Sequence, residues 1–466
     1  NGCPSSARCG LNHLQDMANA GVGAPVMPPT GCEDPAASGC QFRYEACNKN
    51  TLTAAYTAAA PAVGTPFSVD TSLPSFPAIG QAFAAAPLQL QQTLSVYLIA
   101  FAVMTLFHGT LSDSFGRRPV ILGCLITYTL GSIGCAVAQS FGELLLFRGM
   151  QGLAGGAGWT IGRAIVRDSY EGHHAQRMLS LVTMIFGIAP AVAPVIGGWL
   201  QGAFGWRSVF MFLIFYGGAM LAVCWLKLPE THPPSARQPF ELKPLTANYL
   251  KLAGNPLMGL LCLTAAFNFA GFFLYVAAAP AFIYDLLGLG EKHFPVLFAP
   301  MVAGIMAGAF LSGRLAGRLS PRRTVKAGLW LLFGASLLNI GYHALLPPAL
   351  PWSVLPVVCY AVGTALAAPS IQLLVLDMFP VNRGLASSLQ GFVHSTFTAF
   401  TAGLIAPFLS GSALTLALGQ IALLALGSLC WVFYRRRSSR INVPGSEFKV
   451  PSSKSRAAAR TDNLEP

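Results

Sequence analysis

Charged residues are rare in this sequence, and several of them gather in one short stretch. Only 10% of the 466 residues are charged, yet GTLSDSFGRRPV (109–120) places Asp113, Arg117 and Arg118 close together. A glycine there can adopt the positive φ of a tight turn, and the aspartate can accept hydrogen bonds at the exposed N-terminus of a neighbouring helix. We expect a conformational latch formed by Gly109, Asp113, Gly116, Arg117, Arg118 and Asp168. The alternative is that the arginines only fix the membrane topology.

A further charge, Arg148, lies inside an apolar stretch. A charged side chain at the centre of a membrane helix costs about 2.5–3.5 kcal/mol on insertion scales, so such a residue usually faces a cavity or a partner. Gln151 shares its helical face, and Asp70 is the nearest anionic candidate. A buried carboxylate can be kept protonated by desolvation or ionised by a nearby cation. We therefore expect Asp70 and Arg148 to couple proton binding to transport. The alternatives are a static ion pair and a helix-capping role for Asp70.

Long apolar segments must position these side chains. Hydrophobic residues make up 54% of the chain, and the mean hydropathy is +0.57. Segments of about 20 apolar residues can cross a bilayer as helices, whereas barrel strands would be shorter and alternate in polarity. We predict an all-α polytopic membrane protein with twelve transmembrane helices, near residues 51–70, 90–110, 119–138, 144–165, 178–200, 207–227, 256–279, 294–316, 324–346, 351–374, 385–408 and 412–434.

The distribution of Lys and Arg predicts the orientation and the domains. Basic residues follow every even-numbered span, whereas the odd-numbered connections hold only Arg207 and Lys292. The even connections and both termini should therefore be cytoplasmic. The predicted divisions are an atypical N-terminal segment (1–50), a six-helix bundle (51–227), a cytoplasmic linker (228–255), a second six-helix bundle (256–434) and a cytoplasmic basic tail (435–466).

The two halves read as degenerate repeats of one another. GRLAGRLSPRRTV (313–325), which follows span 8, is similar to GTLSDSFGRRPV, which follows span 2, but it lacks the aspartate. Parallel repeats of six spans place a central cavity at their interface, where alternating access operates by rocking of the two halves.

Further motifs stand at fixed places along the spans. RGMQG (148–152) lies in span 4, GIAPAVAPVIGGWL (187–200) lies in span 5, and SVDTSLPSFPAI (68–79) and QQTLSVYLIAFA (91–102) lie in spans 1 and 2. Together with GTLSDSFGRRPV they resemble the major facilitator superfamily, and within it the bicyclomycin- and chloramphenicol-resistance type of drug:proton antiporter. Ala193 stands where the commonest form of the span 5 motif has glycine.

The resemblance implies a fold and a function. In the major facilitator fold, spans 1 and 4 line the cavity, and the latch aspartate contacts span 11, which begins here near residues 383–388. The implied antiporter motif of span 5 consists of Gly187, Pro190, Pro194, Gly197 and Gly198. The expected function is proton-driven efflux of small amphipathic drugs across a bacterial inner membrane. The alternatives are a metabolite or sugar exporter, a proton symporter of the same superfamily, and a non-transporting membrane receptor.

Aromatic and polar residues within the spans are candidates to line the cavity, because a mostly apolar cavity suits amphipathic drugs of varied shape. They are Tyr97, Phe101, Gln151, Asn268, Phe272, Tyr275, Tyr360, Gln390, His394 and Phe397. Since the sequence holds no phosphate-binding, zinc-protease or nucleophile-elbow motif, we expect no enzyme activity, no metal and no cofactor, with the proton gradient as the energy source. The expected partners are an amphipathic substrate, protons and the lipid bilayer, without nucleic acid, and the expected state is a monomer.

The first 60 residues differ from the rest of the chain. They hold five scattered cysteines and show no periodicity, and the Ala/Thr-rich first span contains Pro61 and Pro66. We interpret this start as altered, by a shifted reading frame or a fusion that ends near residue 60. The rival interpretation is a metal-binding extension, although the cysteine spacings match no zinc pattern.

Overall fold

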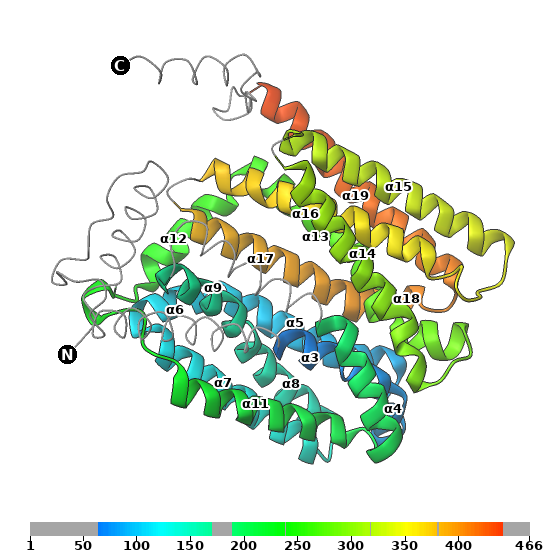
Figure 1. Ribbon diagram of the computed structural model, residues 1–466, viewed down its shortest axis with the longest axis horizontal. Helices are drawn as coiled ribbons and strands as arrows, with labels where there is room; N and C mark the ends of the chain where they lie inside the picture. The colour runs from blue at the N-terminus through cyan, green and yellow to red at the C-terminus, as the bar shows by residue number, and fades with distance from the viewer. Residues whose placement is uncertain (1–63, 170–188, 238, 317, 380–381, 441–466) are drawn as a thin grey trace, which may run out of the picture.

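The computed structural model describes residues 64–169, 189–237, 239–316, 318–379 and 382–440. These residues are almost entirely helical, and nine of their helices are long and apolar enough to cross a membrane. Figure 1 shows two groups of helices, one from the N-terminal half and one from the C-terminal half, with α5 (Pro87–Thr105) and α17 (Arg383–Phe400) side by side between them. The predictions for residues 1–63, which include most of span 1, fall outside the described residues.

The N-terminal bundle follows the predicted spans, with breaks inside two of them. Predicted span 2 forms two helices, α5 and α6, and predicted span 4 is divided at Gly156 into α8 and α9. Spans 1 and 5 are described only in part, and residues 189–204 of span 5 are helical. The other elements of this half are α3 (Gly64–Asp70), η2 (Leu73–Ser75), α4 (Phe76–Phe83), α6 (His108–Phe115), α7 (Arg117–Val137), α8 (Phe141–Gly155), α9 (Ala157–Ser169) and α11 (Arg207–Lys227).

The C-terminal bundle matches its six predicted spans, and π-helical turns adjoin two of them. One π-helix, η4 (Ala281–Leu286), follows α13, and another, η6 (Thr401–Ile405), continues α17. Helix α19 continues to Arg440, so the first residues of the predicted tail are an extension of the last span. The other elements are α13 (Pro256–Ala277), η5 (Glu291–His293), α14 (Phe294–Leu315), α15 (Pro321–Leu345), α16 (Leu355–Met378), α18 (Ala406–Leu409) and α19 (Ala413–Arg440).

Local sequence explains where many of these helices begin. Ser140 caps α8 by accepting a hydrogen bond from the Glu143 amide, and the Glu143 carboxylate accepts one from the Gln139 amide. Asn255 caps α13 in the same way through the amides of Leu257 and Met258. Proline stands in the first turn of α5, α13, α14 and α15, where its missing N–H costs nothing.

The linker contains a helix that the sequence analysis did not predict. Besides the short turn η3 (Pro234–Ala236), it forms α12 (Leu242–Ala253), whose Leu245 and Leu252 are buried. The Tyr249 hydroxyl donates a hydrogen bond to the Leu106 carbonyl at the end of α5 (2.9 Å). Burial raises the pKa of the Tyr249 phenol above its ordinary value, although a hydrogen bond with Ser388 of α17 opposes that shift. The linker helix therefore bridges the ends of α5 and α17.

Candidate functional site

A charged network occupies the interior of the N-terminal bundle, centred on Arg148 of α8, which is only 1% exposed. Its guanidinium Nη1 donates to the Ser68 carbonyl (3.0 Å) and to Gln151 Oε1 (2.9 Å), and the guanidinium lies 4.9 Å from the centre of the Tyr97 ring. Gln151 Nε2 in turn donates a hydrogen bond to Ser132 Oγ of α7 (2.8 Å), which extends the network to that helix. Hydrogen bonds of this kind make a buried charge tolerable.

The structure does not pair Arg148 with Asp70. Asp70 ends α3 and is buried, at 4% exposure, two residues beyond Ser68. The ion pairs among the described residues do not include one between Asp70 and Arg148. Arg148 Nη2 has no hydrogen-bond partner among the described residues. The static pair considered from the sequence is therefore not present in this arrangement, and one guanidinium nitrogen remains open to a partner.

An uncharged network lies inside the C-terminal bundle. Asn339 of α15 donates to the Tyr275 hydroxyl (2.7 Å) and to Gln420 Oε1 (2.9 Å), which joins α13, α15 and α19. The Tyr360 hydroxyl of α16 donates to the Asn268 carbonyl (3.1 Å). All five side chains are at most 2% exposed. Three of the predicted cavity residues, Tyr275, Tyr360 and Asn268, thus lie inside this bundle and hold its helices together.

Aromatic rings gather where α13 meets α17, and all of them except the buried Phe272 are half-buried. The His394 ring lies 4.3 Å from that of Phe269, and Phe397 lies 4.9 Å from Phe267 in an edge-on arrangement. Phe272 is also near, 5.5 Å from Phe269. Sequence reasoning named Phe272, His394 and Phe397 but missed Phe267 and Phe269, because an apolar span gives no signal of which phenylalanines face inward. We call these five residues the aromatic cluster.

Helices α5 and α17 touch one another on both sides of the aromatic cluster. Towards the start of α5, Ser95 donates to the Ala399 carbonyl (3.0 Å) and Gln92 to the Gly403 carbonyl in η6 (3.1 Å). Towards its end, a Cβ placed on Gly391 would lie 3.1 Å from Thr105 Cγ2. The remaining predicted cavity residues are half-buried: Phe101 lies on α5 between Ser95 and Thr105, and Gln390 lies on α17 next to Gly391.

Several residues of the predicted latch contact one another within the N-terminal half. The Arg117 Nε lies 3.0 Å from Asp168 Oδ2, and its Nη1 donates to Ser112 (2.6 Å) and pairs with Asp113. Arg118 instead donates to the Trp225 carbonyl (2.7 Å). No hydrogen bond or ion pair between described residues joins Asp113 to α17, so the expected contact with span 11 is not made in this arrangement.

The two latch glycines have different environments. Gly116 has a φ of +102°, as a tight turn before α7 requires. A Cβ on Gly109 would lie 4.0 Å from Thr160, an ordinary separation, so no close helix approach requires glycine there.

A carboxylate that sequence reasoning missed completes the latch. Glu230, which follows α11, accepts hydrogen bonds from the backbone amides of Arg117 (3.0 Å) and Arg118 (3.3 Å) at the N-terminus of α7. Its other neighbour is Arg237, at 3.7 Å. An anion at a helix N-terminus is stabilised by the helix dipole. The sequence signal was an acidic residue directly after span 6, in LPETHPP (228–234).

The antiporter motif packs span 5 tightly. Gly187 lies outside the described residues, and Pro190 and Pro194 lie in the helical range 189–204. A side chain on Gly197 would collide with the Thr71 carbonyl, and one on Gly198 with the Glu291 carbonyl, which belongs to the other half. Gly197 therefore allows backbone contact within the N-terminal half, and Gly198 allows it where the two halves meet.

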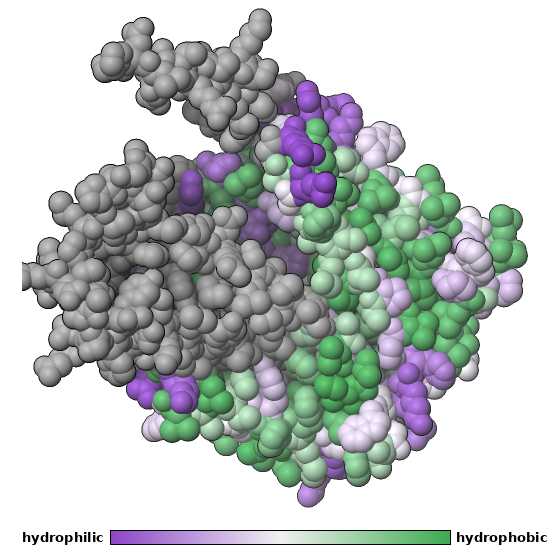
Figure 2. All heavy atoms as spheres, in the orientation of Figure 1, coloured by the Kyte–Doolittle hydropathy of each residue, from purple (hydrophilic) through white to green (hydrophobic). Residues whose placement is uncertain are grey.

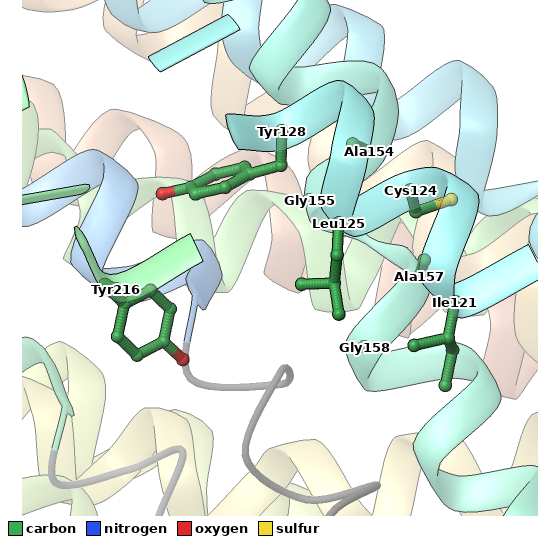
Figure 3. Close-up of a pocket in the computed structure, with 9 residues that line it drawn as sticks. All are labelled: Ile121, Cys124, Leu125, Tyr128, Ala154, Gly155, Ala157, Gly158 and Tyr216. Atoms are coloured by element: carbon green, nitrogen blue, oxygen red, sulfur yellow. The ribbon is translucent and has the colours of Figure 1, made fainter. Parts of the chain in front are cut away.

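A small pocket lies within the N-terminal bundle, away from the interface of the halves. Figure 3 shows Tyr128 and Tyr216 at one end and Ile121 and Cys124 at the other. Its lining residues come from α7, α8, α9 and α11, and none of them was predicted as a cavity residue. Buried His108, at the start of α6, was also missed, although a histidine in an apolar span is a visible signal.

Comparison with known proteins places these features in a family. A family model described as Major Facilitator Superfamily matches residues 62–401. A bicyclomycin resistance protein homolog of Haemophilus influenzae is 27% identical over 383 residues, which cover 80% of this chain and 94% of the relative. Multidrug resistance protein D of Escherichia coli is 27% identical over 364 residues, which cover 76% and 89%.

Solved structures show the same fold. A bacterial homologue of the human lysosomal transporter Spinster, inward-facing and occupied, matches with a TM-score of 0.64 and 20% identity, over 84% of this chain and 97% of that one. A D-xylose-proton symporter matches with a TM-score of 0.61 and 14% identity, over 82% and 96%. With the family model spanning most of its helices, the chain belongs to the Major Facilitator Superfamily of multi-pass membrane transporters.

Proposed function

We propose that this transporter exports small amphipathic drugs by proton-driven alternating access from a bacterial cytoplasm. The proton gradient is its energy source and it uses no cofactor. It acts as a monomer in the inner membrane, with both termini in the cytoplasm. The names of the curated relatives, which refer to bicyclomycin and multidrug resistance, support the substrate class. The basic residues that follow the even-numbered spans support the orientation.

The observation that carries the proposal is the burial of Asp70 beside the Arg148 network. Among the described residues, Asp70 is the one carboxylate that is buried. A carboxylate that leaves water is favoured in its neutral form, and a neighbouring guanidinium favours the ionised form. Arg148 Nη2, which has no partner among the described residues, can supply that neighbour after a small movement. Proton binding and release at Asp70 would then make and break an interaction between α3 and α8.

Substrate would bind at the aromatic cluster, which lies between the two contact points of α5 and α17. Four of its five rings are half-buried, and rings that belong to different helices offer an apolar surface that adapts to varied shapes. Access from one side requires loss of the Ser95 and Gln92 hydrogen bonds, and access from the other requires loss of the Thr105–Gly391 and Tyr249 contacts. A change at Asp70 can bias the choice only if the two states differ in its interactions.

The test measures accumulation of a panel of drugs, phenicols included, in an efflux-deficient bacterium that expresses the chain. We expect lower accumulation than in the empty strain, and restoration by a protonophore. Asp70→Asn should remove the protonophore-sensitive part while the protein stays in the membrane. Asp285→Asn, which changes an exposed carboxylate, is the matched control and should transport normally.

Two results would decide against the proposal. Unchanged accumulation for the whole panel would reject drug efflux and favour export of a metabolite or sugar. Unimpaired transport by Asp70→Asn would remove Asp70 from the coupling mechanism. A symporter would instead accumulate its substrate when the outside is acidified, which the same cells can report.

A further inference from the structure

The two repeats treat their equivalent arginines differently. In the N-terminal half, Arg117 is paired with Asp113 and Asp168, and Glu230 caps the same helix. Its counterpart in the repeat is Arg322 in the first turn of α15, where no aspartate precedes it. Arg322 donates to the Ser438 hydroxyl of α19 (2.8 Å), and its Nε has no hydrogen-bond partner among the described residues.

Other cations surround Arg322, and the ion pairs found among the described residues include none of them. The basic surface, as we call it, consists of Arg314, Arg318, Arg322, Arg323, Lys326, Arg435, Arg436 and Arg437. All but the half-buried Arg322 are exposed. Asp377, at the adjacent end of α16, is exposed and pairs with no member in this part of the structure. Figure 2 shows hydrophilic residues gathered over this end of α19.

An apolar surface continues directly from the basic surface along both helices. On α15, Arg323 and Lys326 are followed on the same face by Trp330, which is 68% exposed. On α19, Leu429, Phe433 and Arg436 follow one another at spacings of four and three residues, which places them on one face. Phe433 is 49% exposed. Because α15 and α19 pack against each other and Arg322 bonds to Ser438, the basic ends of the two helices are neighbours, and each helix carries exposed apolar side chains beyond its basic end.

We propose that this surface of α15 and α19 binds the headgroup of an anionic phospholipid, whose acyl chains lie along Trp330 and Phe433. Arginine recognises phosphate through several hydrogen bonds at once, and basic clusters at the ends of membrane helices attract anionic lipids. The exposed apolar side chains distinguish a lipid from a soluble phosphate, which would use only the cations. The charge needed for topology is already supplied elsewhere, by the arginines after spans 2 and 4.

The experiment uses the purified full-length chain in detergent and counts retained lipid by native mass spectrometry. Equal amounts of phosphatidylglycerol and phosphatidylcholine are offered. We expect phosphatidylglycerol to be preferred. The variant Arg323→Gln/Arg436→Gln/Arg437→Gln should lose that preference by about tenfold or more, since each basic residue near the surface adds to the attraction. The control Lys227→Gln/Lys243→Gln/Lys251→Gln removes three exposed cations from another region and should keep the preference.

Further arms keep the result decisive. Arg→Lys at the same three positions preserves charge and should retain most of the binding. Glycerol 3-phosphate tests the soluble source, and equal displacement of lipid by it at matched concentration would overturn the lipid assignment. An equal loss in the lysine control, or no preference in the unmodified protein, would overturn the site. If the glutamine variant does not fold, two measurements on the unmodified protein decide: its preference for phosphatidylglycerol, and the weakening of that preference by salt. None of these readouts depends on drug transport.

Discussion

At the scale of single residues, the buried polar networks of the two halves differ in charge. The N-terminal network is built on a buried guanidinium, and the C-terminal network on Asn339, Gln420 and Tyr275. A neutral network that is fully buried fixes helices to one another and has no charge state to change at ordinary pH. A network with a buried cation and a nearby carboxylate can exist in two charge states. We therefore assign the moving chemistry to the N-terminal half and the rigid support to the C-terminal half.

Replacement of Arg148 by lysine should remove most of the efflux although it keeps the charge. The planar guanidinium serves Ser68, Thr93 and Gln151 at once, whereas an ammonium group is a point charge that cannot reproduce that fork. We expect roughly a tenfold loss of protonophore-sensitive efflux or more, with membrane levels maintained. Lys243→Arg, an exposed exchange of the same two residue types, is the control. Normal efflux by Arg148→Lys would show that the charge alone suffices.

Removal of the Phe269 ring should change which compounds are exported more than how fast the cycle runs. Phe269 contacts both His394 and Phe272, and aromatic pairs contribute about 0.5–1.5 kcal/mol beyond their buried area. Phe269→Ala should therefore shift the resistance conferred against aromatic drugs by about two- to tenfold, with smaller shifts for others. Phe310→Ala, at a 68% exposed position on α14, should leave every value unchanged. A uniform loss across the panel would point to misfolding or to a general defect in cycling.

Individual site residues were predictable where a charge interrupts an apolar span. Arg148 stands out for that reason, and Asp70 and Arg117 stand out as charges at the ends of spans; all three are buried. Partners were less predictable, because they depend on which helix faces which. Thus Arg148 bonds to Ser68 where Asp70 was expected, and Arg117, not Arg118, pairs with Asp168. Neutral partners such as Asn339 and Gln420 were visible as polar residues in spans, but nothing local to the sequence shows that they meet.

At the scale of elements, the helices end and bend where packing requires it. Hydropathy finds spans because each must match the bilayer, so nine of the twelve predicted spans coincide with described helical stretches of sufficient length. It does not find breaks such as Gly156 or the π-helix η6, because they leave the mean hydropathy of the segment unchanged. The linker helix α12 was missed because two buried leucines in a polar segment are too few to form a clear pattern. Its stability comes from docking against α17 and α13.

The cap on α7 gives a prediction at this scale. Glu230→Ala removes an acceptor for the amides of Arg117 and Arg118 and the counter-ion of Arg237. Loss of such a cap costs about 1 kcal/mol, which thermal unfolding of the purified protein should detect as a lower midpoint. Glu230→Gln keeps an acceptor, so its unfolding midpoint should lie between those of the unmodified protein and Glu230→Ala. Glu241→Ala, at the start of α12 where no side-chain cap bond is made, is the control. Equal midpoints for Glu230→Ala and the control would remove Glu230 from the latch.

At the scale of the whole molecule, transport requires the two halves to change their contacts while each half stays intact. The helix pair α5 and α17 is joined near its two ends, and the aromatic cluster lies between. The contacts on one side are hydrogen bonds to main-chain carbonyls at or next to the π-helix η6, so they are made by few groups and can be exchanged. In an alternating-access cycle, each set opens in turn.

Two cysteine pairs test this requirement directly. Ser95→Cys/Ala399→Cys fixes the contact towards the start of α5, where the Ser95 hydroxyl now reaches the Ala399 carbonyl, and Thr105→Cys/Gly391→Cys fixes the other. We expect oxidation of either pair to stop efflux and a reductant to restore it, because a cross-link at either end leaves one side permanently closed. The oxidised parent protein, with its native cysteines, is the control and should remain active. Full activity of a protein shown to be cross-linked at one pair would mean that this end does not open during transport. The substrate path would then have to pass elsewhere between the halves.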